Sequence, residues 1–248
     1  MRPSAQKSLQ QVRHAFRRGY TAVPLVREVP EDTFTPVEAY LRLTAAAGPS
    51  FLLESVEGGE RLARYSFLGA RPFELISVRQ GRVLSSSPER GRIPGPGDAF
   101  RELGRRLMRF RAPREPGLPP FCGGAVGYVG YEMFRHLEPC VALPPPDEDE
   151  ARFMLCADVV VFDRLRHRLL LIANVMDGPG PLARRYGRAA RSLDEMQRLL
   201  RRPSRPAQPV SRTAPEKLQA ALGEAAYCAG VRRLKSRIRA GDIFQAVL

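Results

Sequence analysis

The residues that could bind a small ligand lie at the end of a short apolar stretch. The sequence Leu52-Leu53-Glu54-Ser55 places a carboxylate beside a hydroxyl. A carboxylate can pair with an ammonium group and a hydroxyl can donate or accept a hydrogen bond next to it, so the pair would suit an amino acid. The alternative is a strand end that turns into solvent. Because neighbouring strand residues point to opposite faces, both side chains could serve one ligand only if the strand bulges or one acts through its backbone.

The guanidinium of Arg64 is a third candidate ligand group. Arg64 precedes the apolar stretch 65–69, which predicts a strand next to the one that ends at Glu54. The fork of an arginine can hold a carboxylate through two hydrogen bonds. Taken alone, a surface salt bridge is the alternative role for this side chain.

The other motifs predict structure rather than chemistry. The glycine-dense segment 123–131 lacks the spacing of dinucleotide-binding and phosphate-binding loops. Glycines three apart in a strand indicate close backbone approach instead. The histidines are isolated and the cysteines form no Cys-x-x-Cys pair, so a structural zinc site is not expected. No nucleophile–base pair and no paired carboxylates can be assembled from the sequence.

The composition is that of a globular protein with an excess of arginine. The chain has 40 Lys and Arg against 26 Asp and Glu, a net charge of +14, which makes nucleic acid the first partner to consider. The arginines are scattered over separate segments without interleaved aromatic residues to stack on bases, so no nucleic-acid partner is predicted. No signal peptide and no apolar run of about 20 residues is present, which predicts a cytoplasmic protein without a membrane span.

Apolar periodicity and turn residues divide the first 200 residues into helices and strands. The clearest helix start is Thr35, which can cap a helix from Pro36, with Glu38 completing a capping box. The expected helices span residues 35–47, 98–110, 131–137 and 181–200. The expected strands span residues 50–56, 64–69, 73–78, 82–86, 121–131, 153–162 and 169–175. The third and fourth strands flank a hairpin turn, and the last two form a long hairpin.

A linker and a second, shorter segment follow. Residues 201–213 are rich in proline and arginine and lack an apolar pattern, which predicts a linker. A second capping-box pattern begins at Thr213 and predicts a helix that ends at Gly241. The apolar residues 243–248 then begin a strand. Because a bare apolar strand edge invites aggregation, the sequence is expected to be truncated.

Taken together and in this order, the segments resemble anthranilate synthase component I, from about residue 12 to residue 248. Each motif alone is unspecific, whereas this many in one order is specific. The segments that carry the resemblance are 19–24, 35–40, 50–55, 58–61, 64–69, 123–132, 158–163 and 240–245. The resemblance implies an α+β fold of layered antiparallel sheets with packed helices. It implies a tryptophan-sensing domain over residues 1–200, a linker over 201–213 and an incomplete chorismate-binding catalytic domain over 214–248.

The resemblance also implies an activity. Enzymes of this family convert chorismate and ammonia to anthranilate and pyruvate in tryptophan biosynthesis. A glutamine amidotransferase subunit supplies the ammonia, magnesium holds the chorismate, and tryptophan inhibits. The family's leucine-leucine-glutamate-serine motif belongs to the tryptophan site, which makes Glu54 and Ser55 the expected effector contacts, with Arg64 as a weaker third.

The catalytic half of the family's site is expected to lie outside this sequence. The resemblance places a second tryptophan segment, the magnesium carboxylates and most chorismate-binding residues after residue 248, so no metal ligand is expected here and the chain alone should be inactive. Gln245 stands on the active-site strand, where related enzymes that add water to chorismate carry a lysine base. An amide cannot act as a base at neutral pH but can form hydrogen bonds, which suits an ammonia-using enzyme.

Two other functions remain open at the level of sequence. One is component I of aminodeoxychorismate synthase, the sister enzyme of folate synthesis, which has the same fold and substrate. The other is a stand-alone tryptophan-binding regulatory module without catalysis. The amino-acid sequences of the segments 52–55 and 64–69 favour the anthranilate enzyme.

Overall fold

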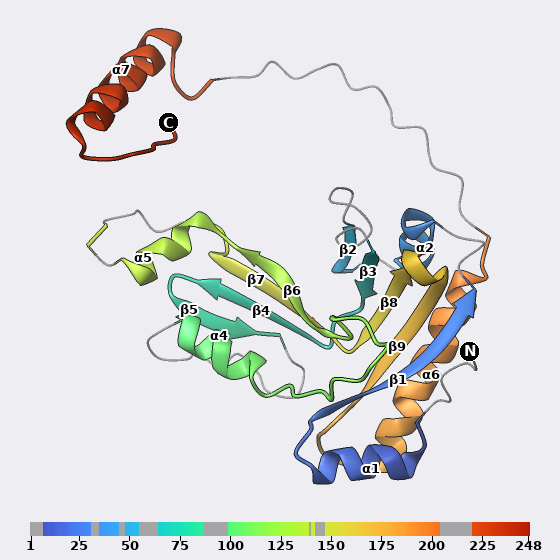
Figure 1. Ribbon diagram of the computed structural model, residues 1–248. Coiled ribbons are helices and arrows are strands. Elements are labelled where there is room, and N and C mark those ends of the chain that lie inside the picture. Colours follow the sequence, from blue (N-terminus) through green and yellow to red (C-terminus); the bar gives the residue numbers. More distant parts are fainter. Residues whose placement is uncertain are drawn as a thin grey trace. The chain divides into compact units, whose positions relative to one another are not determined.

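The computed structural model describes residues 7–30, 35–44, 48–54, 64–86, 99–138, 140–141, 147–203 and 220–248. The chain divides into two compact units, Met1–Arg205 and Pro206–Leu248. The first unit contains two antiparallel sheets with helices packed against them, as Figure 1 shows. The expected α+β class with layered antiparallel sheets is therefore confirmed.

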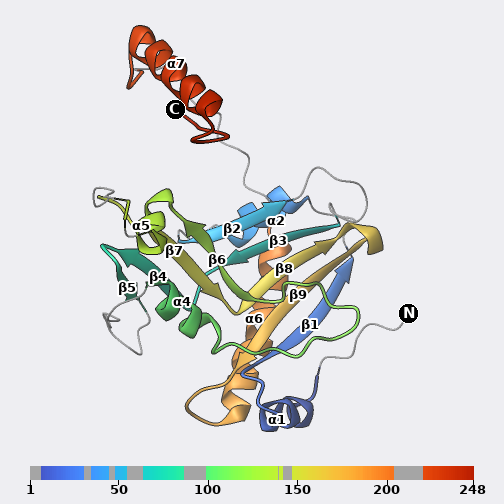
Figure 2. The same cartoon turned by 60° about the vertical axis from the view of Figure 1, so that its left-hand side comes forward.

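The larger sheet, sheet A, carries helices on one face. Its strands are ordered β1 (Ala22–Pro30), β9 (Arg168–Met176), β8 (Asp158–Asp163), β3 (Tyr65–Ala70) and β2 (Ser50–Glu54). The helices on this face are α1 (Leu9–Arg17), α2 (Pro36–Leu43) and α6 (Leu182–Leu200). In Figure 2 the strands of sheet A follow one another across the view from β2 at the top to β1, and α2 and α6 lie behind the sheet.

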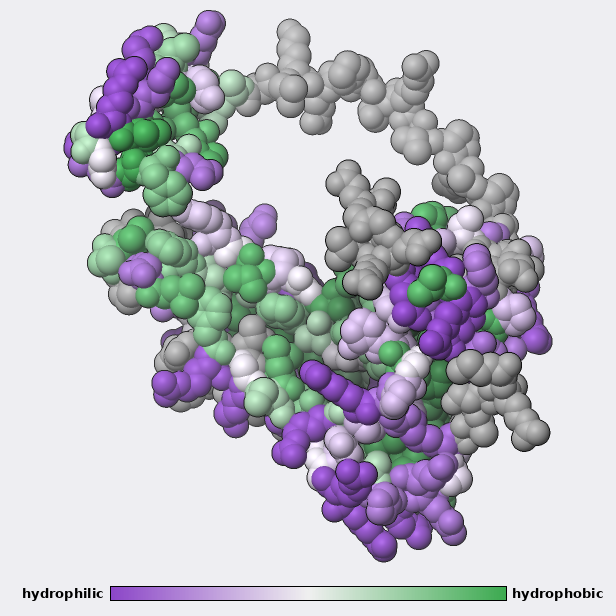
Figure 3. All heavy atoms as spheres, viewed as in Figure 1, coloured by the Kyte–Doolittle hydropathy of each residue, from purple (hydrophilic) through white to green (hydrophobic). Residues whose placement is uncertain are grey.

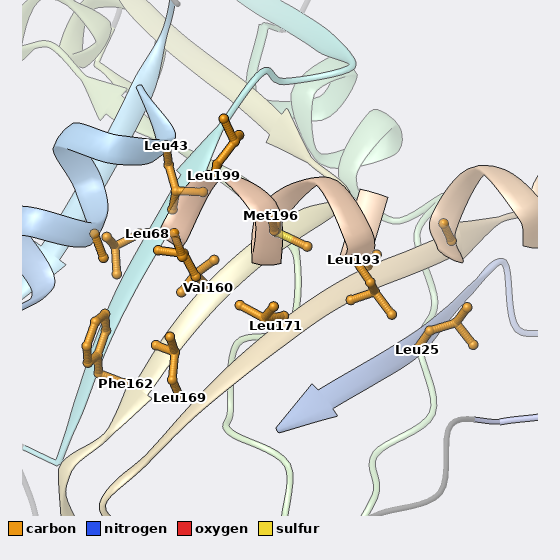
Figure 4. Close-up of a cluster of buried hydrophobic side chains, with 14 of the residues drawn as sticks. Leu25, Leu43, Leu68, Val160, Phe162, Leu169, Leu171, Leu193, Met196 and Leu199 are labelled. Carbon is orange, nitrogen blue, oxygen red and sulfur yellow. The ribbon is translucent and has the colours of Figure 1, made fainter. Parts of the chain in front are cut away.

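The main core lies between sheet A and these helices. Figure 4 shows Phe162 and Leu171 of the sheet directed toward the helix layer, which contributes Leu43, Leu193 and Met196. All these side chains are buried. Burial of apolar surface of this kind is the main source of folding free energy.

The opposite face of sheet A is covered as well. Val159 and Val161 alternate with the core residues of β8 and pack on this second face. Their cover includes Leu118 and Phe121, from the segment before β6 that crosses in front of β8 and β9 in Figure 2. Burial on both faces explains why β8 and β9 have continuous apolar sequences instead of an alternating pattern.

The smaller sheet, sheet B, has the order β5 (Arg82–Ser85), β4 (Glu74–Arg79), β7 (Ala151–Cys156) and β6 (Gly124–Val129). Its core packs against α4 (Ala99–Leu107) and against the turn formed by η1 (Tyr131–Met133) and α5 (Phe134–Leu137). The expected hairpin is present between β4 and β5, and its turn residues Gln80 and Gly81 both have positive φ. Two positive φ values are typical of a tight two-residue hairpin turn.

The expected strand 153–162 is wrong in one respect, because it consists of two strands in different sheets. The chain leaves sheet B after Cys156 and enters sheet A at Asp158. Asn174 holds this crossing: its Nδ2 donates to the Cys122 carbonyl at 2.6 Å and to the Ala157 carbonyl at 2.7 Å. Periodicity could not reveal the crossing, because both halves are apolar and each finds its partner elsewhere in the sequence.

Apolar side chains gather on one part of the surface of the first unit. Figure 3 shows them around β6 and α5. Tyr128, Tyr131 and Leu137 are each at least half exposed there. Met133, which lies between Tyr131 and Leu137 in the chain, is buried in the core of sheet B. Its burial packs this segment against the sheet.

The second unit contains α7 (Glu224–Ala240), which ends at Gly241 with a left-handed φ of 81° as expected. The helix expected to run on from Thr213 is not continuous, because residues 220–223 are not helical; Thr213 itself lies outside the described residues. Residues 243–248 do not form the expected strand. A strand needs a partner for its backbone groups, and no pairing with this segment occurs among the described residues.

Helix and strand ends differ from expectation elsewhere too. Thr35 caps α2 and accepts a hydrogen bond from the Glu38 backbone, but the helix ends at Leu43. The Glu38 carboxylate pairs with Arg42 at 2.6 Å.

None of the helices in the described part of the chain is long and apolar enough to cross a membrane.

Gly127 is required by the close approach of β6 to β7. A Cβ atom at this position would lie 1.9 Å from the carbonyl oxygen of Arg152. We expect Gly127→Ala to lower the free energy of unfolding by about 1–3 kcal/mol, since the backbones must move apart. Urea denaturation followed by circular dichroism measures this change.

The matched control for Gly127→Ala is Gly104→Ala in α4. Apart from its chain neighbours and the backbone of its own helix, no described atom lies within 4 Å of the Cβ position there. Alanine should raise the stability of the helix by about 0.5–1 kcal/mol relative to glycine. Equal effects at the two positions would contradict the close strand approach.

Candidate functional site

Glu54 ends strand β2 and faces Ser66 of the neighbouring strand β3. Its Oε1 accepts a hydrogen bond from Nη2 of Arg164 at 3.1 Å. The same Nη2 lies 3.2 Å from the hydroxyl of Ser66, which is fully buried. The Glu54 side chain is 27% exposed and that of Arg164 is 43% exposed. The structure therefore places a carboxylate and a guanidinium, both open to solvent, over one buried hydroxyl.

The position of Arg164 follows from the hairpin between β8 and β9. Arg164 is the first residue after β8, and its backbone N–H donates to the carbonyl of Arg64 at 3.0 Å. The turn continues as the short helix η2 (Arg164–Arg166) and closes at His167, which has a left-handed φ of 46°. Because β3 lies between β8 and β2, the Arg164 side chain crosses β3 to reach Glu54.

Arg64 binds a different carboxylate. Its Nε donates to Oδ1 of Asp163 at 2.7 Å and its Nη2 donates to Oδ2 at 2.9 Å. The guanidinium also lies 4.7 Å from the ring centre of Tyr65. Asp163 is fully buried and receives a further hydrogen bond from Arg168 at 3.2 Å. Arg64 is thus one of two arginines that neutralise a buried carboxylate.

The charges of this cluster shift its titration. Burial by itself raises the pKa of Asp163, but the hydrogen bonds and positive charges of Arg64 and Arg168 outweigh burial and bring the pKa below its ordinary value. The hydrogen bond to Asp163 raises the pKa of Arg64, although burial opposes it. Asp163 is therefore ionised at neutral pH and holds the fork of Arg64.

The two ion-pair groups lie on opposite faces of sheet A. Ser66 alternates with Tyr65 along β3, and two residues further on Leu68 packs in the helix-covered core. Tyr65 packs on the second face. Glu54, opposite Ser66, belongs to the helix-covered face, whereas Asp163, opposite Tyr65, belongs to the other. The structure does not bring Arg64 and Glu54 to one ligand position.

The other expected site residues are not assembled with Glu54. Ser55 lies outside the described residues, so its role as an effector contact remains a prediction. Gln245 follows α7 in the second unit and is exposed. Arg164 was missed at the level of sequence, because it is one of three arginines in the segment 164–168 and nothing in the sequence tells which one crosses β3.

The cysteines offer no reactive thiol at this site. Burial raises the pKa of Cys122 to about 11 and that of Cys156 to about 12. Cys140 and Cys228 are exposed. Because the thiolate is the reactive species, we expect Cys140 and Cys228 to react rapidly with Ellman's reagent at pH 8 and the buried pair to react only after denaturation. Rapid reaction of four thiols in the native protein would contradict this burial.

The described residues contain no metal site either. Nowhere in this part of the chain do three or more His, Cys, Asp or Glu side chains come together to hold a metal ion. Within the described ranges no such cluster is available to hold a magnesium ion.

Comparison with known proteins points to one family. Residues 49–248 match the family described as chorismate binding enzyme. Anthranilate synthase component 1 of Streptomyces coelicolor is 37% identical over 245 residues, which cover 94% of this chain and 44% of that protein. The protein of the same name from Acinetobacter calcoaceticus is 34% identical, over 97% of this chain and 49% of its own length.

A solved structure is similar in fold. Anthranilate synthase component I from Streptococcus pneumoniae superposes with a TM-score of 0.56 at 22% sequence identity, covering 86% of this chain and 46% of that one. The chain thus spans about half the length of the relatives it matches. Because the family match covers most of its residues, the chain belongs to the chorismate binding enzyme family.

Proposed function

We propose that the chain is the N-terminal part of an anthranilate synthase large subunit, and that its first unit senses tryptophan. The names of the relatives support the enzyme, which would form anthranilate from chorismate and glutamine-derived ammonia. The observation that carries the sensing role is the carboxylate of Glu54, which ends β2 and stays partly exposed beside a guanidinium. An exposed carboxylate of this kind can bind an ammonium group.

The proposed effector contacts are Glu54 and Ser55. Arg64 is proposed in a supporting role, because its fork holds Asp163 on the other face of the sheet. Through Asp163 it fixes the end of β8, from which Arg164 reaches Glu54. Arg64 would thus act on the site by positioning and not by contact.

Most of the residues that would bind the substrate lie outside this chain. Chorismate and magnesium would bind mainly in the portion that the relatives carry and this chain does not match. Gln245 would line the substrate site as a hydrogen-bonding amide. A glutamine amidotransferase subunit would supply the ammonia, and the protein would act in the cytoplasm.

Tryptophan binding by the full-length protein tests the sensing role, because the resemblance places a second tryptophan segment after residue 248. We expect isothermal titration calorimetry to show tryptophan binding that Glu54→Gln weakens about 10–100-fold, since a hydrogen bond to a charged group contributes about 1.5–3 kcal/mol. Glu195→Gln on α6 is the matched control, because Glu195 is partly exposed and pairs with Arg71 as Glu54 pairs with Arg164. Absence of tryptophan binding by the full-length protein would contradict the sensing role.

An assay of anthranilate formation tests the proposal that catalysis requires residues outside this chain. We expect the 248-residue chain to form no anthranilate from chorismate, ammonium and magnesium, because the residues proposed to hold magnesium and most of the chorismate would lie in the portion of the relatives that this chain does not match. The fluorescence of anthranilate measures this directly. Turnover by the chain alone would show that its own residues suffice for catalysis.

A further inference from the structure

Arg164 and Glu54 each leave polar atoms open. Among the described residues the side chain of Arg164 donates only through Nη2, so its Nε and Nη1 are without a partner there. Glu54 accepts only through Oε1. By contrast, Arg64 uses both Nε and Nη2 on Asp163, and its side chain is 23% exposed against 43% for Arg164. Of the two guanidinium groups, that of Arg164 is thus the more exposed and has more N–H groups left to bind a ligand.

The orientation of Arg164 is fixed from two sides. The buried hydroxyl of Ser66 lies 3.2 Å from Nη2, and the backbone N–H of Arg164 is bonded to the Arg64 carbonyl. A side chain held in this way loses less conformational freedom when it binds a ligand. Its pair with Glu54 is partly exposed, and such pairs contribute little to stability, so a ligand can open it at low cost.

We propose that Arg164 binds the carboxylate of an α-amino acid whose ammonium group binds Glu54. This inference rests on the proposed effector function and names the cation of that site. The carboxylate of the ligand would replace Glu54 at Arg164, and its ammonium group would replace Arg164 at Glu54. Every charge keeps an opposite partner before and after binding, so no charge is left uncompensated.

The experiment separates the two ends of the ligand. Calorimetry on the full-length protein compares tryptophan with tryptamine, which lacks the carboxylate. We expect Arg164→Gln to weaken tryptophan binding about 10–100-fold, as for the loss of a bidentate arginine–carboxylate pair, and to leave tryptamine binding within about twofold. Arg166→Gln, an exposed arginine in the same turn, is the control and should change neither.

The outcomes distinguish this inference from the function on which it rests. If the wild-type protein does not bind tryptophan, the effector function itself fails. If it binds and Arg164→Gln binds equally well, the function stands and the inference is overturned. Equal losses for tryptophan and tryptamine would also overturn it, because Arg164 would then act only by holding Glu54. A selective loss of tryptophan binding supports it.

Discussion

Replacing Asp163 with asparagine is expected to lower the free energy of unfolding by about 3–5 kcal/mol, the range measured when one partner of a buried ion pair is removed. Asp163 is fully buried and neutralises both Arg64 and Arg168. An amide cannot balance their charge, and it can accept hydrogen bonds through only one of its two positions. Urea denaturation at pH 7, followed by circular dichroism, measures the loss.

The same variant should change the pH dependence of stability. The pKa of Asp163 is lowered in the folded protein, so its stabilisation is complete above its ordinary pKa of about 4 and is lost as the pH falls through the folded value. Wild-type stability should therefore fall below about pH 4 by a share that Asp163→Asn lacks.

Asp194→Asn is the control for Asp163→Asn. Asp194 pairs with Arg27 at the surface with 67% of its side chain exposed, and its loss should cost no more than about 1 kcal/mol. A similarly small effect for Asp163→Asn would contradict the buried cluster.

Asn174→Asp is expected to destabilise the protein by at least about 3 kcal/mol at neutral pH. The amide nitrogen of Asn174 donates to two carbonyls, those of Cys122 and Ala157, at the crossing between the sheets. A carboxylate would face the same carbonyl oxygens without a proton to donate, leaving several buried acceptors unsatisfied at about 1–3 kcal/mol each. Thermal unfolding at pH 7 measures the effect.

Asn174→Ala separates the lost hydrogen bonds from the added charge. Alanine removes the two donors without placing a negative charge in the crossing, so its effect should be smaller than that of aspartate. The difference should shrink at low pH, where a protonated aspartate can donate one hydrogen bond again. A larger loss for alanine than for aspartate would contradict the role assigned to the amide.

Local sequence patterns were sufficient for most elements of the first unit. The turn at Gln80 and Gly81 and the cap at Thr35 could be predicted because each rests on residues close together in the chain. The division of residues 151–163 between two sheets could not, because it depends also on the pairing of β7 with β4 and of β8 with β3, which lie more than 60 residues earlier in the chain. The break before α7 could not be predicted either, because the expected helix from Thr213 passes through residues 220–223, which are not helical.

The candidate site was predictable in part. The chemistry of Glu54 could be stated from its residue type, but its partner could not. Arg64 was the nearer arginine in the motif, yet strand alternation and the pairing of Tyr65 with Asp163 direct it to the other face. Arg164 lies 110 residues from Glu54 in the chain. It reaches Glu54 because β8 and β2 both pair with β3, so only one strand lies between them.

The pairing of β1 with β9 has a consequence for protein synthesis. Strand β1 ends at Pro30, and its partner is not complete until Met176. At roughly 5–20 residues per second, the ribosome needs about 7–30 s to supply that partner. During this interval Val23, Leu25 and Val26 have no strand beside them, and unpaired apolar strands in such intermediates aggregate. Nascent chains stalled between these two strands should therefore depend on chaperones to stay in solution.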